Sequence, residues 1–368
     1  KLSVQTMSTD SYMAMDNINY SAKEEERLAQ IKYERKLKAI LCKRGYLKPG
    51  KIVDTLQGTI WRAIQQSTNT PIVIKITSKE LTSESSVIVN GQKYEISENI
   101  LTEKNILKYL SNDEKCPKSI TKYVDFMKSN VNFYLIMEDG GHSLFEFNIK
   151  VHEYIECGKI EISEWHKLVK IIFKQILECL EFMHSKKVCH FDVSLENILI
   201  NDIECAYNET GDKLLFCYDK DKEGSVQAKL CDFGIAEYFK EIEDQKEEER
   251  LEKDIFKSNK FCGKRCYQSP EISIMKKNFN AASNDIWCLG VCLFMLITGN
   301  APFRMSSIQD QYFNMIINEN GDITKLMKKW NKMKYITDDL IELFKSLFQF
   351  ESDRINIEGI RKSKWLNS

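Results

Sequence analysis

Residues able to do chemistry stand beside two apolar segments of the sequence. Lys75 interrupts the apolar run Val73-Ile74-Lys75-Ile76, and a buried ammonium is costly unless it is paired. Asp192 and Asn197 lie five residues apart in His190–Ile200, just before the apolar Ile198-Leu199-Ile200. Aspartate and asparagine are also ordinary turn residues, so this pair alone does not separate a catalytic loop from a surface turn. The order of the other motifs decides between them.

Length and composition exclude several classes of protein. A chain of 368 residues is long enough for two lobes or domains. The formal net charge of −1 argues against a general nucleic-acid-binding or membrane-binding surface. No run of about eighteen apolar residues occurs, so we expect no membrane span. The twelve cysteines lack the spacing of a zinc site or a redox pair, which favours reduced thiols and a cytoplasmic protein.

Periodicity indicates the elements that must position these residues. Apolar and polar residues alternate over 51–64 and 71–76, as in neighbouring antiparallel strands. A strand is expected at 132–137, and apolar residues at helical spacing over 163–184 predict a core helix that leads to His190. Glu103 lies among apolar residues at helical spacing in 100–110 and is the candidate partner of Lys75; the alternative is a solvated i,i+4 charge.

Further motifs follow along the chain. They are Asp232-Phe233-Gly234, then Ser269-Pro270-Glu271, then Asp285-Ile286-Trp287 at the start of an apolar helix. Together with the lysine strand and the spacing His-x-Asp-x-x-x-x-Asn, this order resembles the eukaryotic protein kinases over about residues 51–368. The strongest local likeness is to divergent kinases of protists, including the apicomplexan group named for Phe-Ile-Lys-Lys, although Val73–Ile76 lacks that signature.

The resemblance implies an α+β, bilobal protein kinase fold. A small N-lobe with an antiparallel sheet and the αC helix is expected over 51–138, and the hinge with a larger, mainly helical C-lobe over 139–368. Within the C-lobe we expect an insertion at about 201–227 and a long activation segment at 232–271. The N-terminal extension 1–50 carries a capping-box pattern at Ser21–Glu24, which predicts a helix at about 22–44. Packing of this helix on the body of the protein is favoured over binding of a regulator.

The same resemblance implies a role for each site residue, with ATP and Mg²⁺ as cofactors. Asp192 corresponds to the base that accepts the proton of the substrate hydroxyl, and Asn197 and Asp232 correspond to the magnesium ligands. Lys75, held by Glu103, corresponds to the lysine on the ATP phosphates. The remaining positions have supporting roles: Met137 as gatekeeper, the backbone of Glu138 to Gly140 against adenine, His190 as a packed structural residue, Asp285 on the catalytic-loop backbone, and Arg354 paired with Glu271.

The glycine-rich loop departs from the family pattern. Its third glycine falls on Gly58 and its valine on Ile60, but Val53 and Thr55 replace the first two glycines. Glycine at these positions lets backbone amides approach phosphate closely. We therefore expect a stiffer loop that grips nucleotide less well.

Two other departures are linked in our interpretation. The family's lysine two residues after the catalytic aspartate is replaced by Ser194, and the threonine of its activation segment is replaced by Lys264. The two positions face each other in the family fold. We hypothesise an exchange in which Lys264 brings the ammonium to the γ-phosphate and Ser194 supplies the hydroxyl; the alternative is an exposed Lys264 and a simple loss at Ser194.

A third departure concerns control. Phe191 replaces the arginine that binds a phosphorylated activation loop in regulated kinases, and Lys260 occupies the usual phosphate-acceptor position. We therefore predict activity that does not depend on phosphorylation of the activation loop. The function implied by the whole pattern is phosphoryl transfer from ATP to Ser/Thr hydroxyls of protein substrates; the alternative is a pseudokinase that acts as a binding scaffold.

Overall fold

The structure is a computed structural model, and it describes residues 9–84, 86–89, 92–95, 97–219, 225–239 and 256–368. The chain divides into two compact units, Lys1–Ile76 and Thr77–Ser368. The acidic run 241–254, part of the predicted activation segment, lies outside the described residues. The predicted lobe boundary at residues 138 and 139 stays a prediction.

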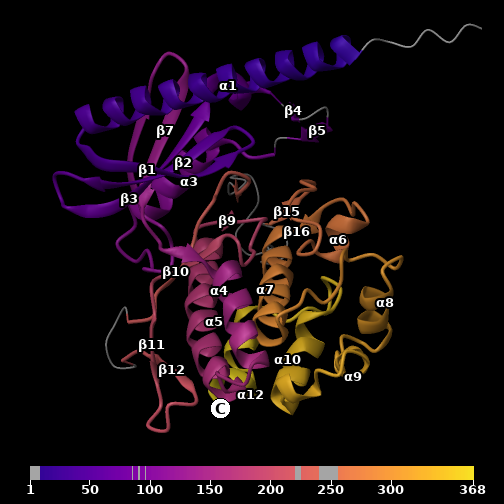
Figure 1. Cartoon of the computed structure of the whole chain (residues 1–368). Coiled ribbons are helices and arrows are strands. Elements are labelled where there is room, and N and C mark those ends of the chain that lie inside the picture. Colours follow the sequence, from indigo (N-terminus) through magenta and orange to yellow (C-terminus); the bar gives the residue numbers. More distant parts are fainter. Residues whose placement is uncertain (1–8, 85, 90–91, 96, 220–224, 240–255) are drawn as a thin grey trace, which may run out of the picture. The chain divides into compact units, whose positions relative to one another are not determined.

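The first unit contains one long helix and a set of strands (Figure 1). Helix α1 spans Thr9–Lys43, and it is followed by β1 (Tyr46–Thr55), β2 (Gly58–Gln65) and β3 (Thr70–Ser78). The predicted start of the helix near residue 22 is wrong, since α1 begins at Thr9. No glycine or proline occurs between residues 9 and 43, so nothing in the sequence stops the helix at the capping-box pattern.

Helix α1 contacts β1 through its C-terminal half. Leu37 and Leu41 are buried there, and Glu34 forms an ion pair with Lys51 of β1 at 2.8 Å. Leu28, by contrast, is 57% exposed. The predicted packing of this helix on the body of the protein is therefore confirmed for its last turns.

The predicted strand 51–64 is a hairpin of two strands. β1 and β2 pair in antiparallel register with Thr55 opposite Gly58, so Leu56 and Gln57 form the turn. The alternation of apolar residues continues through this turn, and for that reason periodicity alone did not separate the two strands. Val53 and Thr55, which replace the first two glycines, both lie on β1, where they pair with Ile60 and Gly58 of β2.

In the second unit, an antiparallel strand pair and helix α3 precede a helical region. The elements before the hinge are α2 (Lys79–Ser83), β4 (Ser86–Val89), β5 (Gln92–Glu95), α3 (Ile100–Ser111), β6 (Tyr123–Lys128) and β7 (Asn132–Glu138). The N-terminus of α3 is capped by Asn99, whose Oδ1 accepts the backbone N–H groups of Leu101 and Thr102. The backbone N–H of Asn99 donates to the carbonyl of Gly234, so the start of α3 is fixed to the Asp232-Phe233-Gly234 segment.

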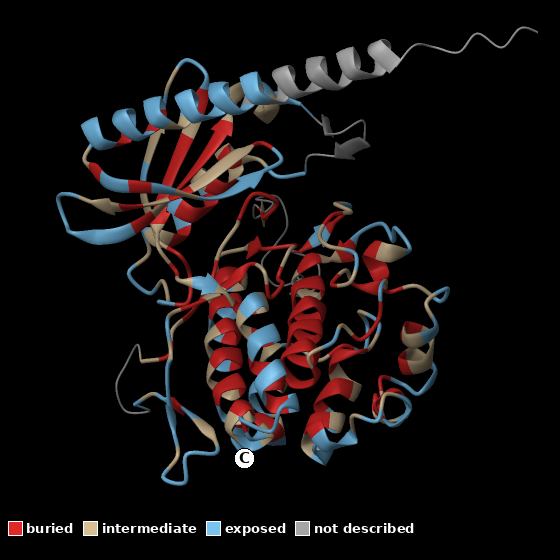
Figure 2. Ribbon diagram, in the orientation of Figure 1, coloured by how far each residue is buried: buried red, intermediate tan, exposed pale blue. Residues whose placement is uncertain are grey.

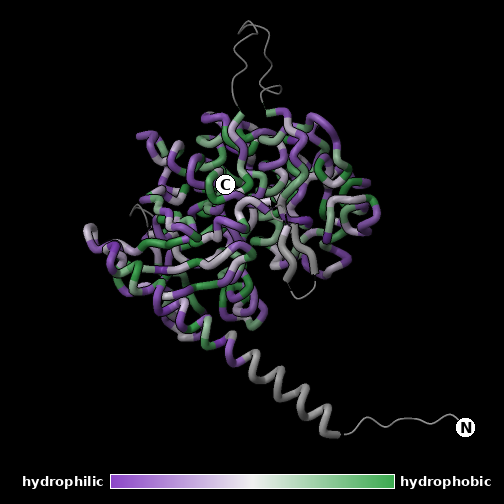
Figure 3. Tube along the Cα trace, turned by 90° about the horizontal axis from the view of Figure 1, so that it is seen from above, coloured by the Kyte–Doolittle hydropathy of each residue, from purple (hydrophilic) through white to green (hydrophobic). Residues whose placement is uncertain are grey.

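The helical region is built around α5 and α7. Its helices are α4 (Leu144–Glu156), α5 (Ile162–Ser185), α6 (Pro270–Ser273), α7 (Ala281–Thr298), α8 (Gln311–Asn318), α9 (Thr324–Lys329), α10 (Asp338–Leu347), α11 (Ile357–Arg361) and α12 (Lys364–Asn367). Figure 2 shows α7 buried along its length. Along the trace in Figure 3, hydrophobic and hydrophilic stretches alternate at short intervals, as expected where each helix turns one face to a core.

Helix α7 is the one described helix that is long and apolar enough to cross a membrane. Within the fold, 89% of it is buried. The burial identifies α7 as a core helix of this unit.

Short strands connect these helices at the site. They are β8 (His142–Ser143), β9 (Val188–Cys189), β10 (Ile198–Ile200), β13 (Ala228–Leu230), β14 (Glu237–Tyr238), β15 (Lys257–Ser258) and β16 (Phe279–Asn280). The predicted insertion contains a hairpin of β11 (Glu204–Tyr207) and β12 (Leu214–Cys217). Phe216 anchors this hairpin by packing its ring against Phe147 and Trp165.

Candidate active site

The backbone of the catalytic loop is held by one buried carboxylate. Asp285, at the start of α7, is fully buried, and its Oδ2 and Oδ1 accept the backbone N–H groups of His190 and Phe191, each at 2.9 Å. His184, near the end of α5, contacts the same Oδ2 through Nε2 at 3.0 Å. The predicted role of Asp285 in holding the loop is therefore confirmed. Phe191 adopts a left-handed backbone with φ of 68°, which these contacts help to hold in place.

His190 is a packed residue. Its side chain is fully buried, its Nδ1 accepts the backbone N–H of Asp192, and its Nε2 lies 3.1 Å from the carbonyl of Cys231. Its ring meets the edge of Phe233 at 5.0 Å between centroids. Burial lowers the pKa of His190, so the ring is neutral, with Nε2 as the donor to Cys231. This confirms the structural reading and fixes Asp192 relative to Asp232.

Asp192 is oriented by three donors from two segments. Its Oδ2 accepts from Nδ2 of Asn197 at 2.7 Å and from Nζ of Lys264 at 2.8 Å. Its Oδ1 accepts the backbone N–H of Lys264 at 3.1 Å. The carboxylate is thereby held in one orientation while its side chain stays 13% exposed.

The ammonium of Lys264 bridges Asp192 and Ser194. Its Nζ lies 2.9 Å from Oγ of Ser194, a residue that is itself fully buried. Burial opposes the charge on Lys264, but the carboxylate of Asp192 outweighs it, and the pKa of Lys264 is raised. Positions 194 and 264 do face each other, and the ammonium stays charged beside the candidate base.

Asn197 and Asp232 have the chemistry that a divalent cation needs. Both hydrogen bonds of Asn197 Nδ2 go to Asp192, one to its carbonyl and one to its carboxylate. Within the described part of the chain no group donates to Oδ1 of Asn197, so this amide oxygen is available as a ligand. Asp232 has a left-handed backbone, with φ of 64°, and is connected to Asn197 through the bond from Cys231 N–H to the Asn197 carbonyl. An amide oxygen and a carboxylate are oxygen donors of the kind that Mg²⁺ prefers.

Lys75, predicted to reach the ATP phosphates, and Glu103, predicted to pair with it, come from different units. Lys75 is in β3 of the first unit and is only 6% exposed, between the buried Ile74 and Ile76. Glu103 is in α3 of the second unit and is 1% exposed. The burial of Lys75 agrees with the pattern of its strand, and the burial of Glu103 argues against a solvated charge. Gly58, Val53 and Ile60 are on the β1–β2 hairpin of the first unit.

The hinge is held by an ion pair between Glu138 and Lys229 that the sequence analysis did not predict. Met137 and Glu138 end β7, and Oε1 of Glu138 forms an ion pair with Lys229 at 3.1 Å. Lys229 is 8% exposed and also donates to the carbonyl of Lys118. Gly140 packs so closely on Leu199 that an added Cβ would lie 2.7 Å from it. Lys229 interrupts the apolar strand Ala228–Leu230 just as Lys75 interrupts its own strand, and this was the signal that could have found it.

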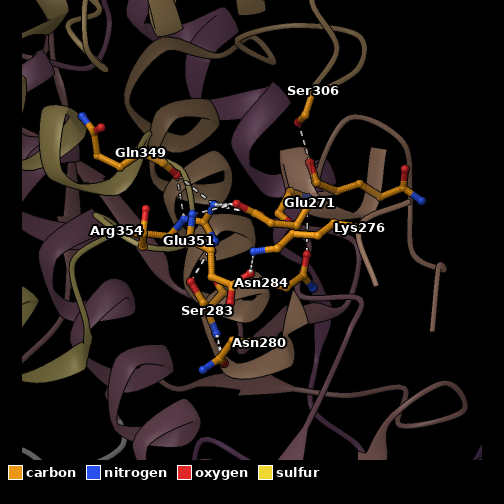
Figure 4. A network of polar contacts seen from close by, with 12 residues as sticks. Glu271, Lys276, Asn280, Ser283, Asn284, Ser306, Gln349, Glu351 and Arg354 are labelled. Atoms are coloured by element: carbon orange, nitrogen blue, oxygen red, sulfur yellow. Dashed lines mark hydrogen bonds and ion pairs between the residues drawn. The ribbon is translucent and has the colours of Figure 1, made fainter. Parts of the chain in front are cut away.

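A buried ion pair fixes the end of the activation segment (Figure 4). The guanidinium Nη2 of Arg354 contacts both carboxylate oxygens of Glu271, at 3.1 and 3.0 Å, and Arg354 also donates to Ser283 and to the carbonyl of Gln349. Its guanidinium lies 4.9 Å from the ring centroid of Trp287. The predicted pairing of Arg354 with Glu271 is confirmed, and it joins the Ser-Pro-Glu segment to the chain between α10 and α11.

Comparison with known proteins identifies the class. Residues 55–366 match the protein kinase domain, so the chain belongs to the protein kinase family. The predicted α+β fold, with antiparallel strands in one lobe and helices in the other, is confirmed.

Several curated relatives are serine/threonine-protein kinases. The chain is 24% identical to serine/threonine-protein kinase CHK1 of Saccharomyces cerevisiae over 273 residues, which cover 72% of this chain and 43% of that protein. It is 26% identical to serine/threonine-protein kinase atg1 of Dictyostelium discoideum over 316 residues, 84% of this chain and 37% of that protein. It is 23% identical to serine/threonine-protein kinase dkf-1 of Caenorhabditis briggsae over 313 residues, 84% of this chain and 33% of that protein. The chain thus matches less than half the length of each of these relatives.

Proposed function

We propose that this chain is a protein serine/threonine kinase that uses ATP and Mg²⁺. The observation that carries the proposal is the set of contacts around Asp192, where an oriented carboxylate, an available amide oxygen of Asn197 and the ammonium of Lys264 lie together. The serine/threonine-protein kinases among its relatives support the type of substrate. The departures at positions 53, 55, 191 and 194 support the view that it is a divergent member of the family.

In this proposal, Asp192 accepts the proton of a substrate hydroxyl. The hydroxyl oxygen forms a bond to the γ-phosphorus of ATP while the bond from that phosphorus to the β,γ-bridging oxygen breaks, and ADP leaves. Asn197 and Asp232 would hold magnesium, which neutralises charge on the phosphates when it is bound. Lys75, held by Glu103, would contact the phosphates, and the backbone of Glu138 to Gly140 would meet the adenine, with Met137 as the gatekeeper.

Lys264 has the role of the missing lysine in this mechanism. Its ammonium is charged and contacts the candidate base, and in this proposal it would also contact the γ-phosphate of ATP. Ser194, whose hydroxyl bonds to the same ammonium, would replace the family's threonine hydroxyl. This exchange keeps one ammonium and one hydroxyl next to Asp192 with their positions in the chain reversed.

We also propose a cytoplasmic location for the protein. All twelve cysteines, each within the described residues, are free thiols, which is consistent with a cytoplasmic protein. Binding of a regulator to α1 stays a prediction, as does the absence of nucleic-acid partners.

Nucleotide binding and phosphate transfer test the proposal in sequence. We expect ATP to raise the thermal unfolding temperature only when Mg²⁺ is present, and labelled ATP to transfer phosphate to serine or threonine of a generic basic protein. Asp192→Asn should retain nucleotide binding and lose transfer by a factor of about 10² or more. Binding without transfer in the natural sequence would favour the pseudokinase alternative, and neither binding nor transfer would refute the proposal.

A further inference from the structure

An apolar cluster joins the catalytic loop to both ends of the activation segment. Its buried members come from four stretches of chain: Cys189 and Phe191; Ile235 and Phe239; Phe256 and Cys262; and Ile272, Phe279 and Ala281. Phe191, the residue before the candidate base, is 1% exposed and meets the edge of Phe279 at 6.3 Å between ring centroids. The position that carries an arginine in regulated relatives is therefore part of an apolar core.

Lys260 closes this cluster with a charge. Its Nζ lies 5.3 Å from the ring centroid of Phe191, within the range of a cation–π contact. The same Nζ donates to the carbonyl of Ile235, three residues after Asp232. One ammonium thus connects the residue before the base, the segment after the candidate metal ligand, and the returning strand of the activation segment.

Ser258 fixes the backbone of Lys260. Its hydroxyl is buried, donates to Oε2 of Glu237 at 3.2 Å, and accepts the backbone N–H of Lys260 at 3.1 Å. Glu237 is in β14, which pairs with β9 directly before the catalytic loop. A phosphate on Ser258 would put a dianion beside the carboxylate of Glu237 and would draw the ammonium of Lys260 away from Phe191 and Ile235.

We propose that Lys260 is a positioning residue that orders the catalytic loop and the activation segment without any phosphate. In regulated relatives, an arginine before the catalytic aspartate binds a phosphate that has been added to the activation segment. In this chain the activation segment instead carries the positive charge of Lys260, which contacts Phe191 at the arginine's position. The charge on the activation segment therefore has the opposite sign. For its catalytic consequences the inference rests on the proposed kinase function. It adds the group responsible for phosphate independence, and it predicts that negative charge at Ser258 lowers activity.

The test compares variants of the whole chain that carry no phosphate, as verified by mass spectrometry. Lys260→Met keeps the aliphatic stem and removes the charge; we expect kcat to fall about ten- to hundredfold, because a charged hydrogen bond and a cation–π contact are both lost. The KM for ATP should change by less than about threefold, since Lys260 contacts no predicted nucleotide-binding residue. Lys260→Arg should restore most of the rate, and Ser258→Glu should lower it. Lys277→Met, an exposed lysine of the same region, is the control and should behave like the unaltered protein.

Hydrogen exchange separates positioning from general stability and does not require catalysis. In Lys260→Met, exchange should rise in residues 233–239 and 257–263 and stay unchanged in α5 and α7. The proposal is overturned if exchange in these two segments equals that of the unaltered protein, or if phosphorylating the activation segment raises kcat tenfold. If Lys260→Met does not fold, the kcat of Lys260→Arg is compared with that of Ser258→Glu instead. The proposal expects a higher kcat for Lys260→Arg, so equal values for the two variants would contradict it. If the unaltered protein transfers no phosphate, the proposed function fails while the exchange result still tests the role of Lys260.

Discussion

Removing the ammonium of Lys264 is the perturbation that tests the proposed exchange most directly. Lys264→Met keeps the length of the side chain, and the backbone N–H of residue 264 can still donate to Oδ1 of Asp192. Only the contacts of Nζ with Asp192 and Ser194 are lost. The candidate base therefore keeps two of its three donors, and the variant reports chiefly on the charge.

The expected size of the effect follows from the position of the charge. Removing one preorganised donor to developing transition-state charge costs about 10² to 10³ in kcat. The side chain of Lys264 is 37% exposed, so solvent screens part of its charge, and the lower end of this range applies. We expect kcat to fall about a hundredfold, equivalent to about 2.7 kcal/mol, with a smaller change in the KM for ATP.

Steady-state kinetics at varied ATP, together with nucleotide binding measured with Mg²⁺, provide the assay. Arg265→Met removes an exposed charge from the next residue and should change kcat by less than about threefold. The decisive variant is the double substitution Ser194→Lys with Lys264→Thr, which recreates the family's arrangement. It should be more active than Lys264→Thr alone. Turnover of Lys264→Met within twofold of the natural sequence, or no recovery in the double variant, would refute the exchange.

Two further predictions concern stability. Arg354→Met leaves the carboxylate of Glu271 buried without its partner, so chemical denaturation should show that the free energy of unfolding falls by about 3–5 kcal/mol. Lys276→Met breaks the partly exposed pair with Glu351 and should lower it by less than about 1 kcal/mol. Similar losses in both variants would contradict the assignment of Glu271 and Arg354 as a buried pair. Burial lowers the pKa of His166 to about 4, so on acidification the unfolded chain takes up a proton near pH 6.5 while the folded chain takes it up only near pH 4. The free energy of unfolding should therefore decrease as the pH falls through this window, and His166→Gln should flatten the decrease by at most about 3 kcal/mol; an unchanged slope would show that the ring titrates normally.

Much of the second unit follows from short-range patterns in the sequence. The period of apolar residues predicted α5, and the resemblance to the protein kinases implied the catalytic loop, the role of Asp285 and the pair of Glu271 with Arg354. Each of these depends on residues whose chemical type leaves few alternatives. A carboxylate in an apolar helix such as α7 must be satisfied by donors, and the turn that follows α5 supplies them. Such features are predictable because burial of a charge demands a partner.

The first unit was harder to predict because its signals are weaker. The turn at Leu56 and Gln57 contains no proline and keeps the alternation of β1 and β2, so the hairpin looked like one strand. The start of α1 was misplaced because Ser21–Glu24 has the same residue types as a capping box although it lies within the helix. In both cases the local residue types are compatible with two structures: one strand or a hairpin, and a helix that begins at residue 22 or one that begins earlier. The pairing of β1 with β2 and the N-terminal extension of α1 determine which structure forms.

Three lysines of the second unit show why the roles of individual site residues go beyond sequence patterns. The three are the same residue type and lie within residues 229–264 of the sequence. Their ammonium groups nevertheless reach different acceptors: Lys229 reaches Glu138 at the hinge, Lys260 the carbonyl of Ile235, and Lys264 the carboxylate of Asp192. The acceptors are 91, 25 and 72 residues away along the chain. A long flexible side chain has no preferred direction that local sequence could encode, so its destination depends on where the fold brings an electronegative atom. The fold brings one ammonium to each of three acceptors, at the hinge, after Asp232 and at the candidate base, and none of these three lysines stands at the position of the family's catalytic-loop lysine or arginine.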